Sequence, residues 1–217
     1  AYRVGLRGVT PTQAAGLDKV TASNGKTIEL VDVSAHQAKD VLAEDSPEGT
    51  PHVDMVLDVS GSAPTITLNN GVDIPQIGYG VFLTPPEETE RAVLEAFEVG
   101  YRHVYTAQAY RNEEGVGAAV AASGLPREDL FLTTKVWISN AGEERAARSI
   151  DGSLRRLGTD YIDLLLVHQP FGDYYGTYRA MEKALAAGKV RAIGVSNFCP
   201  DRFVDLAQHV EVPPAVN

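Results

Sequence analysis

Three side chains that exchange protons readily fall at comparable places in the chain. Tyr110 follows a predicted strand, and Lys135 and His168 each lie near the C-terminal end of a later predicted strand. Functional side chains gather at these ends when parallel strands form a barrel. A lysine flanked by apolar residues within a strand also needs a polar partner, because a buried ammonium without one is costly.

Each of these side chains also has an ordinary structural explanation when it is taken alone. His168 could be a hydrogen-bonded core histidine at the end of an apolar strand, and Tyr110 a loop tyrosine of no special meaning. Trp137 could serve only in packing. Ser196 or Asn197 could simply cap the next helix. The sequence around these residues is therefore needed to choose between function and structure.

The chain has 217 residues, of which 44% are apolar, enough for one good core or two small ones. No apolar run approaches the roughly 20 residues of a membrane span, and no signal peptide is visible at Ala1. The net charge of −10 argues against nucleic acid but permits a phosphate-bearing cofactor in a local basic pocket. The single cysteine, Cys199, fits a reducing compartment and favours the cytoplasm. The histidines do not have metal-ligand spacing, so no metal is expected.

Strands and helices alternate along the C-terminal two-thirds of the chain. Strands are expected at residues 74–80, 102–107, 130–137, 161–168 and 191–196, with another beginning at 214–217. Helices are expected at residues 87–99, 113–122, 146–157, 177–187 and 201–210. A repeat of about 25 to 35 residues is typical of parallel strands joined by right-handed crossovers. Such a sheet is either open and doubly wound or closed as a barrel. The absence of a G-x-G-x-x-G motif after a strand lowers the open, dinucleotide-binding option.

Residues 1–62 follow a different pattern and are expected to form an N-terminal α+β segment of unknown type. Strands are predicted at residues 3–9, 27–33 and 52–59, a helix at 36–43, and turns at 46–51 and 61–64. Residues 26–32 and 53–61 have a faint likeness to a dinucleotide-binding half-fold, without its glycine fingerprint. The expected boundary separates residues 1–62 from residues 63–217.

Several sequence blocks occur in order from about residue 65. They are residues 66–71 with 74–82, residues 100–117, Leu132-Thr133-Thr134-Lys135-Val136-Trp137, residues 163–170 ending Val167-His168-Gln169-Pro170, and residues 193–198 containing Ser196-Asn197-Phe198. In these blocks the chain resembles the aldo-keto reductase family, most closely the bacterial branch around diketogluconate reductases. The resemblance implies an α/β fold of the TIM (β/α)8-barrel type, here apparently truncated after about six strands. It also implies reduction of aldehydes or ketones with NADPH.

The resemblance implies a role for each proton-exchanging side chain. Tyr110 would be the general acid that protonates the carbonyl oxygen of the substrate. A free phenol, with a pKa near ~10, is a poor acid at neutral pH, so Lys135 would lower that pKa. His168 would donate a hydrogen bond to the same oxygen and orient it.

The resemblance also implies binding positions around this group. Ser196 and Asn197 would hold the nicotinamide carboxamide of the cofactor. Gly80 and Val81 would lie near the nicotinamide. The apolar walls for the substrate would be Phe82 and Trp137.

Two features depart from the family pattern. The family has an aspartate five residues before the tyrosine, paired with the lysine, and this chain has Tyr105 there. Losing that acid leaves Lys135 unpaired and is expected to slow the reaction by roughly 10² to 10³. Tyr105 is also bulkier than aspartate and would crowd the cofactor ribose, and Arg111 replaces a usual glycine. The segments that grip the adenosine 2′-phosphate in the family would lie beyond Asn217.

Three interpretations follow. The first is an NADPH-dependent aldo-keto reductase acting on a small carbonyl substrate, impaired by Tyr105. The second is an inactive barrel fragment or hybrid protein that associates through an open barrel edge. The third makes residues 1–62 part of another nucleotide-binding oxidoreductase, and it predicts three parallel strands there.

Overall fold

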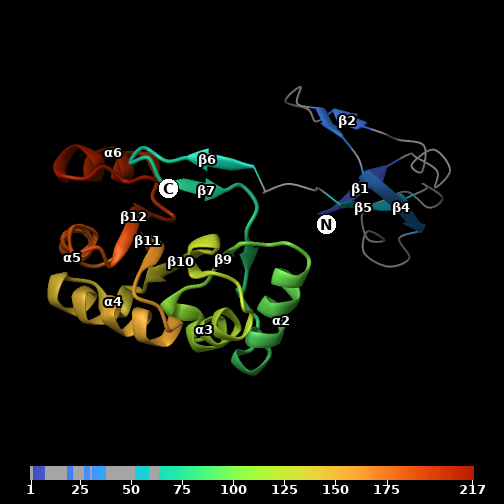
Figure 1. Ribbon diagram of the computed structural model, residues 1–217. Helices are drawn as coiled ribbons and strands as arrows, with labels where there is room; N and C mark the ends of the chain where they lie inside the picture. Colours follow the sequence, from blue (N-terminus) through green and yellow to red (C-terminus); the bar gives the residue numbers. More distant parts are fainter. Residues whose placement is uncertain (1, 8–18, 22–26, 30, 38–51, 59–63) are drawn as a thin grey trace. The chain divides into compact units, whose positions relative to one another are not determined.

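The computed structural model describes residues 2–7, 19–21, 27–29, 31–37, 52–58 and 64–217, with side chains only in the last range (Figure 1). The chain divides into two compact units, Ala1–Ala63 and Pro64–Asn217. Among the described residues, no helix combines the length and the apolar character needed to cross a bilayer.

All described strand pairs of the first unit are antiparallel. β1 (Tyr2–Arg7), β5 (His52–Asp58) and β4 (Val31–Gln37) form a sheet in the order β1-β5-β4. β2 (Lys19–Thr21) and β3 (Thr27–Glu29) form a two-stranded antiparallel sheet. The prediction of three parallel strands is therefore wrong, and with it the third interpretation, because a nucleotide-binding half-fold is built from parallel strands with crossovers.

Two local predictions in this unit also need correction. The strand expected at residues 27–33 is two strands, since β3 ends at Glu29 and β4 begins at Val31. The helix expected at residues 36–43 is wrong at its start, where His36 and Gln37 pair with β5. Residues 38–43 of that expected helix lie outside the described residues.

A five-stranded sheet dominates the second unit. Its order is β12-β11-β10-β9-β8, with every pair parallel. The strands are β8 (Tyr79–Gly80), β9 (His103–Tyr105), β10 (Phe131–Val136), β11 (Ile162–Val167) and β12 (Val190–Val195). The helices are α2 (Pro86–Glu98), α3 (Glu113–Ala122), α4 (Glu143–Leu157), α5 (Tyr174–Ala186) and α6 (Pro200–His209). The predicted alternation of parallel strands and helices is thus confirmed.

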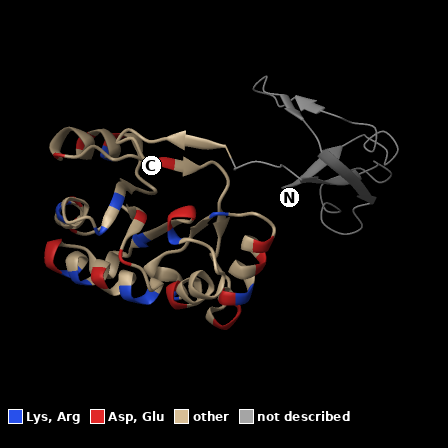
Figure 2. Ribbon diagram, in the orientation of Figure 1, with Lys and Arg blue, Asp and Glu red and all other residues tan. Residues whose placement is uncertain are grey.

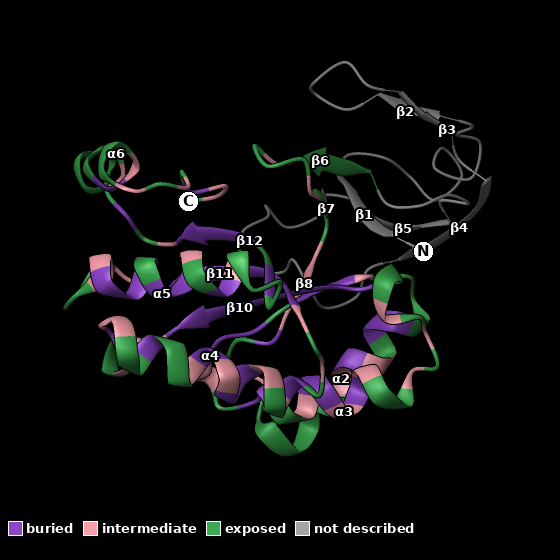
Figure 3. Cartoon of the chain, turned by 60° about the vertical axis from the view of Figure 1, so that its left-hand side comes forward, coloured by how far each residue is buried: buried purple, intermediate pink, exposed green. Residues whose placement is uncertain are grey.

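Burial accounts for the way these elements pack. All residues of β10 and β11 are buried, as Figure 3 shows, and the long apolar run predicted for β11 is confirmed. Helices α2 to α5 line one side of the sheet in Figures 1 and 3. In α4, Ala146, Ile150 and Leu157 recur at helical spacing and are buried in the main core. Gly158 ends this helix in the left-handed region, with φ 62°.

Both ends of the barrel portion differ from the sequence-based expectation. The strand expected at residues 74–80 is divided into β7 (Asp73–Pro75), which pairs antiparallel with β6 (Thr65–Thr67), and β8. Pro75 has no N–H to continue a ladder, which favours a break there. The expected strand at 214–217 is absent as a regular strand. Its backbone still bonds to β12, because the N–H of Ala215 donates to Ile193 O and that of Val195 to Val216 O, both at 2.9 Å.

A buried carboxylate forms hydrogen bonds at the N-terminal end of the parallel sheet. Asp163, the second residue of β11, is fully buried. Its oxygens accept hydrogen bonds from Arg127 Nη2 and Arg191 Nη1, both at 2.7 Å, and from the N–H of Leu132 at 2.9 Å. The single acid in an otherwise apolar strand is therefore fully bonded, as burial of a charge requires.

Candidate functional site

The lysine and tyrosine predicted from the sequence lie in contact. Lys135, near the end of β10, is only 8% exposed. Its Nζ donates hydrogen bonds to Tyr110 Oη at 3.3 Å and to the carbonyl oxygen of Thr106 at 3.1 Å. Tyr110 is the last residue of the 3-10 helix η1 (Gln108–Tyr110), so this short turn after β9 points its phenol at the lysine.

Arg111 fixes the end of that turn at some backbone cost. Its φ of 59° places it in the left-handed region, and its N–H donates to the carbonyl oxygen of Gln108. A non-glycine residue in this region costs about 1 to 2 kcal/mol. Glycine adopts the same conformation without that cost, which explains physically why a glycine suits this position.

His168 lies directly after β11 and completes the cluster. Its ring makes edge contacts with Tyr110 and Trp137, with centroid separations of 5.8 and 4.9 Å. Burial and the nearby Lys135 ammonium lower the pKa of His168 to about 4, so the imidazole is neutral at pH 7. Its Nδ1 is buried without a hydrogen-bond partner among the described residues. Such an atom is costly unless something else bonds to it.

Tyr105 occupies the remaining side of the lysine. Its ring centroid lies 5.3 Å from Lys135 Nζ, which is within cation–π range. In the described part of the chain, no carboxylate forms an ion pair with Lys135. Burial alone lowers the pKa of Lys135 to about 8. An aromatic face therefore stands in for a counter-ion, and the ammonium form is held less firmly than in an ion pair.

One expectation about Tyr110 is wrong. The pKa of its phenol is raised above the usual value, first by burial and then by the neighbouring Tyr105. The lysine was expected to lower that pKa. Burial disfavours the phenolate here, and the lysine faces an aromatic ring instead of an acid that would hold it charged.

Aromatic side chains form an open hollow around this cluster. The hollow has a volume of about 430 Å³ and is lined by Phe82, Ala109, Tyr110, Trp137, His168 and Gln169. The Phe82 ring lies 5.0 Å from that of Tyr110, and the residue is 62% exposed. Tyr110, His168 and both predicted apolar walls thus surround one space large enough for a small molecule.

Ser196 and Asn197 directly follow β12, and neither of them lines the hollow. Asn197 Nδ2 donates to the carbonyl oxygen of His168 at 2.9 Å and to Ser196 Oγ at 3.0 Å. The alternative that one of them caps α6 is wrong, since the N-cap residue is Cys199 and no side chain makes a capping bond. The Asn197 amide instead ties the end of β12 to the residue that carries the imidazole.

Gly80 and Val81 occupy different surroundings from each other. A Cβ added to Gly80 would come within 2.2 Å of Tyr105 Cζ, so the hydroxyl end of the tyrosine ring fills the space beside the glycine. Val81 is fully buried in the main core, and its N–H donates to the carbonyl oxygen of Tyr105 at 3.2 Å. The Val81 side chain therefore packs in the core and does not line the hollow.

Two polar residues that hold the site were not singled out from the sequence. Gln108 Oε1 accepts from the N–H of Trp137 at 3.0 Å, and its Nε2 donates to Ser153 Oγ at 3.1 Å. Asn112 Nδ2 donates to the carbonyl oxygen of Val81 at 2.8 Å, which fixes the turn after β8. Both fall within the sequence block at residues 100–117, and that membership is the signal that could have drawn attention to them.

The part of the chain that contains this site is similar in sequence to known proteins. The model of the aldo/keto reductase family matches residues 76–217. An aldo-keto reductase from Mycolicibacterium smegmatis is 48% identical over 158 residues, which are 71% of this chain and 58% of the relative. The chain thus spans less than two-thirds of that relative's length.

Solved structures agree with the sequence match. The aldo/keto reductase of Brucella melitensis aligns with a TM-score of 0.70 and 46% identity, covering 72% of this chain and 62% of the other. A Bombyx mori aldo-keto reductase in complex with NADP aligns with a TM-score of 0.69 and 36% identity, covering 73% and 58% respectively. The predicted barrel-type fold is confirmed for residues that make up most of the second unit.

Proposed function

This chain belongs to the aldo-keto reductase family, as its sequence blocks predicted, and we propose that it reduces a small aldehyde or ketone to an alcohol with NADPH. The observation that carries this proposal is the contact between Tyr110 and Lys135. The phenol oxygen lies 3.3 Å from Nζ, and the neutral His168 imidazole borders the same hollow. The NADP complex of the Bombyx mori relative supports the choice of cofactor.

The side chains divide the chemistry between them. Tyr110 donates its hydroxyl proton to the carbonyl oxygen, and Lys135 stabilises the phenolate that remains through its hydrogen bond. A neutral His168 donates a ring N–H to the same oxygen and holds it in place. Phe82 and Trp137 keep water away from the carbonyl carbon. The reduced nicotinamide supplies the hydride when it is bound.

The proposed cofactor position rests on residues at the C-terminal ends of β8 and β12. Ser196 and Asn197 would bind the carboxamide, and Gly80 would lie beside the nicotinamide ring. His168, which lines the hollow, supports a polar contact with a molecule bound there. The Tyr105 ring lies against Gly80, so it narrows this part of the site.

We further propose that Tyr105 weakens the activity. A lysine with a pKa of about 8 and no acid beside it loses part of its charge in mildly alkaline solution. A less charged lysine stabilises the phenolate of Tyr110 less, which slows proton donation by roughly 10² to 10³. The raised pKa of Tyr110 acts in the same direction.

The proposal also assigns the activity to one part of the chain and one compartment. Every described side chain of the site belongs to residues 64–217, and we propose that residues 1–62 form a separate segment that contributes none. Cys199 is an exposed free thiol, which supports work in the reducing cytoplasm.

NADPH consumption with a panel of small aldehydes and α-diketones tests the proposal. Tyr110→Phe removes the proton donor and should abolish turnover, whereas Tyr101→Phe, on a ring that packs against Tyr79, should leave it unchanged. The proposal fails if no substrate is reduced by the parent chain or by a Tyr105→Asp chain extended with the remaining barrel sequence of a relative.

A second candidate function is self-association without catalysis. An apolar hollow of about 590 Å³ lies between the β6–β7 hairpin and residues 215–217. Ile66, Ile74 and Val216 are among the residues that line it. Ile66 is exposed, and β8 and β12 are the end strands of the sheet. Sedimentation equilibrium should then reveal a dimer that the Ile66→Glu variant disrupts. A monomer at all concentrations would exclude this function.

A further inference from the structure

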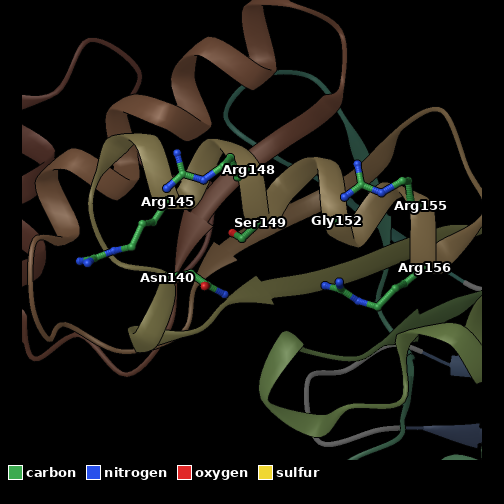
Figure 4. A pocket seen from close by; sticks show the side chains of 7 residues that line it. All are labelled: Asn140, Arg145, Arg148, Ser149, Gly152, Arg155 and Arg156. Carbon is green, nitrogen blue, oxygen red and sulfur yellow. The ribbon is translucent and has the colours of Figure 1, made fainter.

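A second hollow, lined by arginines, lies away from the aromatic one. Its volume is about 430 Å³, and it is lined by Asn140, Arg145, Arg148, Ser149, Gly152, Arg155 and Arg156 (Figure 4). All except Asn140 belong to α4. None of these residues lines the hollow around Tyr110, and no acidic residue lines the arginine hollow.

The positive charge of this hollow is poorly compensated. Arg145 donates only to the carbonyl oxygen of Ala141, at 2.8 and 2.6 Å. The Arg155 guanidinium has no ion pair or hydrogen bond within the described residues. Arg148 lies 3.8 Å from a highly exposed Glu144, and such a pair contributes little. A chain of net charge −10 therefore concentrates unpaired cations on one helix, where Figure 2 shows the basic segments of α4.

Two neighbouring carboxylates already have partners. Glu113 is buried and bonded by Arg156 and by Thr134 Oγ1. Glu143 is paired with Arg179 and Lys183 on α5. The arginines thus keep donor capacity that no side chain among residues 64–217 takes up.

The helix geometry arranges these donors in a row. Residues 145, 148, 152, 155 and 156 recur at spacings of three, four and seven, which places them along one face of α4. From Arg145 to Arg155 the row extends about 15 Å along the helix axis. Gly152 lies in the middle and keeps the floor open, because a Cβ there would approach Arg156 Nη1 to 3.1 Å. Glycine inside a helix costs about 0.5 to 1 kcal/mol, so its presence favours the open floor at the expense of helix stability.

Partly buried hydrogen bonds hold the inner wall in place. Asn140 Nδ2 donates to Gln108 Oε1 at 2.9 Å, and Gln108 Nε2 donates to the carbonyl oxygen of Ser149 at 3.3 Å. Arg156 is anchored through Glu113. A wall that is fixed before a ligand arrives lowers the ordering cost of binding.

We propose that this arginine hollow binds a linear polyanion with several phosphate groups. Guanidinium groups match phosphate oxygens with paired, charge-assisted N–H donors. A row of about 15 Å suits a chain of linked phosphates better than a single phosphate, which reaches only part of it. The polar lining, with a serine and an asparagine between the arginines, favours an ionic ligand over an apolar one.

Calorimetric titration of the full chain with inorganic tripolyphosphate, in the absence of NADPH, tests this proposal. The parent should bind tripolyphosphate more tightly than inorganic phosphate, and binding should weaken as salt rises. Arg148→Ala and Arg155→Ala should each reduce the affinity on the order of tenfold, since each removes a charge-assisted contact. The matched control Arg91→Ala removes an equally exposed arginine from α2 and should change it less than about twofold.

Two outcomes would overturn the proposal. One is no detectable heat or affinity for tripolyphosphate in a folded parent chain. The other is equal loss of affinity in the Arg91→Ala control and in the α4 variants, which would indicate attraction to surface charge alone. Because Arg148 and Arg155 are exposed, circular dichroism is expected to show all three variants folded. Reductase activity does not enter the measurement, so its result is independent of the proposed function.

Discussion

Two buried charges lie at opposite ends of the same sheet and are treated in opposite ways. Asp163 at the start of β11 is bonded by two arginines and a backbone N–H. Lys135, near the end of the adjacent β10, has two neutral oxygens and an aromatic ring around it. The acid is matched by opposite charge, and the lysine is not.

The difference separates a structural ion cluster, at Asp163, from the candidate catalytic site, at Lys135. An ion cluster in which every buried carboxylate oxygen is hydrogen-bonded fixes the strands around it. An ammonium without a counter-ion has a pKa near its working range and keeps the capacity to interact with a neighbouring phenol or a bound ligand. In barrel folds, stability resides at the N-terminal ends of the strands and function at the C-terminal ends, and the two charges follow that division.

The largest effect is expected where the matched charge is removed. Asp163→Ala leaves Arg127 and Arg191 without their partner and should lower the free energy of unfolding by about 3 to 5 kcal/mol. Urea unfolding measures this loss. Asp151→Ala, which breaks an exposed pair with Lys189, should cost about 1 kcal/mol or less. Equal losses in the two variants would contradict the comparison.

Removing the unmatched charge should affect activity far more than stability. Lys135→Met should slow carbonyl reduction by roughly 10² to 10³, because Tyr110 loses its hydrogen-bond donor. The free energy of unfolding should stay equal or rise, since no carboxylate is left unpaired. Steady-state turnover and urea unfolding report the two effects, with the exposed Lys183→Met as control. A loss of stability like that of Asp163→Ala would show that both charges are structural.

The pH dependence of the free energy of unfolding tests the role of Lys135 without a substitution at Asp163. Lys135 has a pKa of about 8 in the folded chain against an ordinary value of 10.5. Between these values the unfolded chain binds more protons, so stability should rise with pH across this window, by up to roughly 3 kcal/mol. Urea unfolding of the parent and of Lys135→Met at several pH values measures this rise, as the difference between their free energies of unfolding. Identical pH profiles of the two chains would refute it.

The smallest expected effect restores a counter-ion to the lysine. Tyr105→Asp should raise the pKa of Lys135, flatten the rise in stability above pH 8 and recover part of the lost rate, with a roughly 10- to 100-fold increase in turnover. It also frees the space against Gly80 that the ring now occupies. Turnover and the pH profile of unfolding are measured on the same variant. Tyr105→Phe serves as the control and should resemble the parent in turnover and in the pH profile of unfolding. If Tyr105→Asp also resembled the parent in these two measurements, the aromatic ring would already replace the acid.

Periodicity determined most of the barrel portion. Each predicted helix from residue 87 onward and the buried β11 follow from apolar spacing and from glycine stops such as Gly158. The prediction of a single strand at residues 74–80 is wrong because pairing partners decide where a strand breaks. Pro75 of β7 pairs with Thr65 of β6, whereas Tyr79 of β8 pairs with Val104 of β9. In residues 1–62, short alternating runs marked strands but carried no information on parallel or antiparallel pairing.

The sequence by itself determined the family and the residue types of the site. Ordered blocks identified Tyr110, Lys135 and His168, because local sequence holds them in recognisable turns and strand ends. Only the tertiary structure decided their electrostatics. The pKa of Tyr110 rises and that of Lys135 falls because burial depends on side chains that meet from distant segments. The same holds for Gln108 and for the arginine hollow on α4, whose partners and free donors appear only when the helices pack.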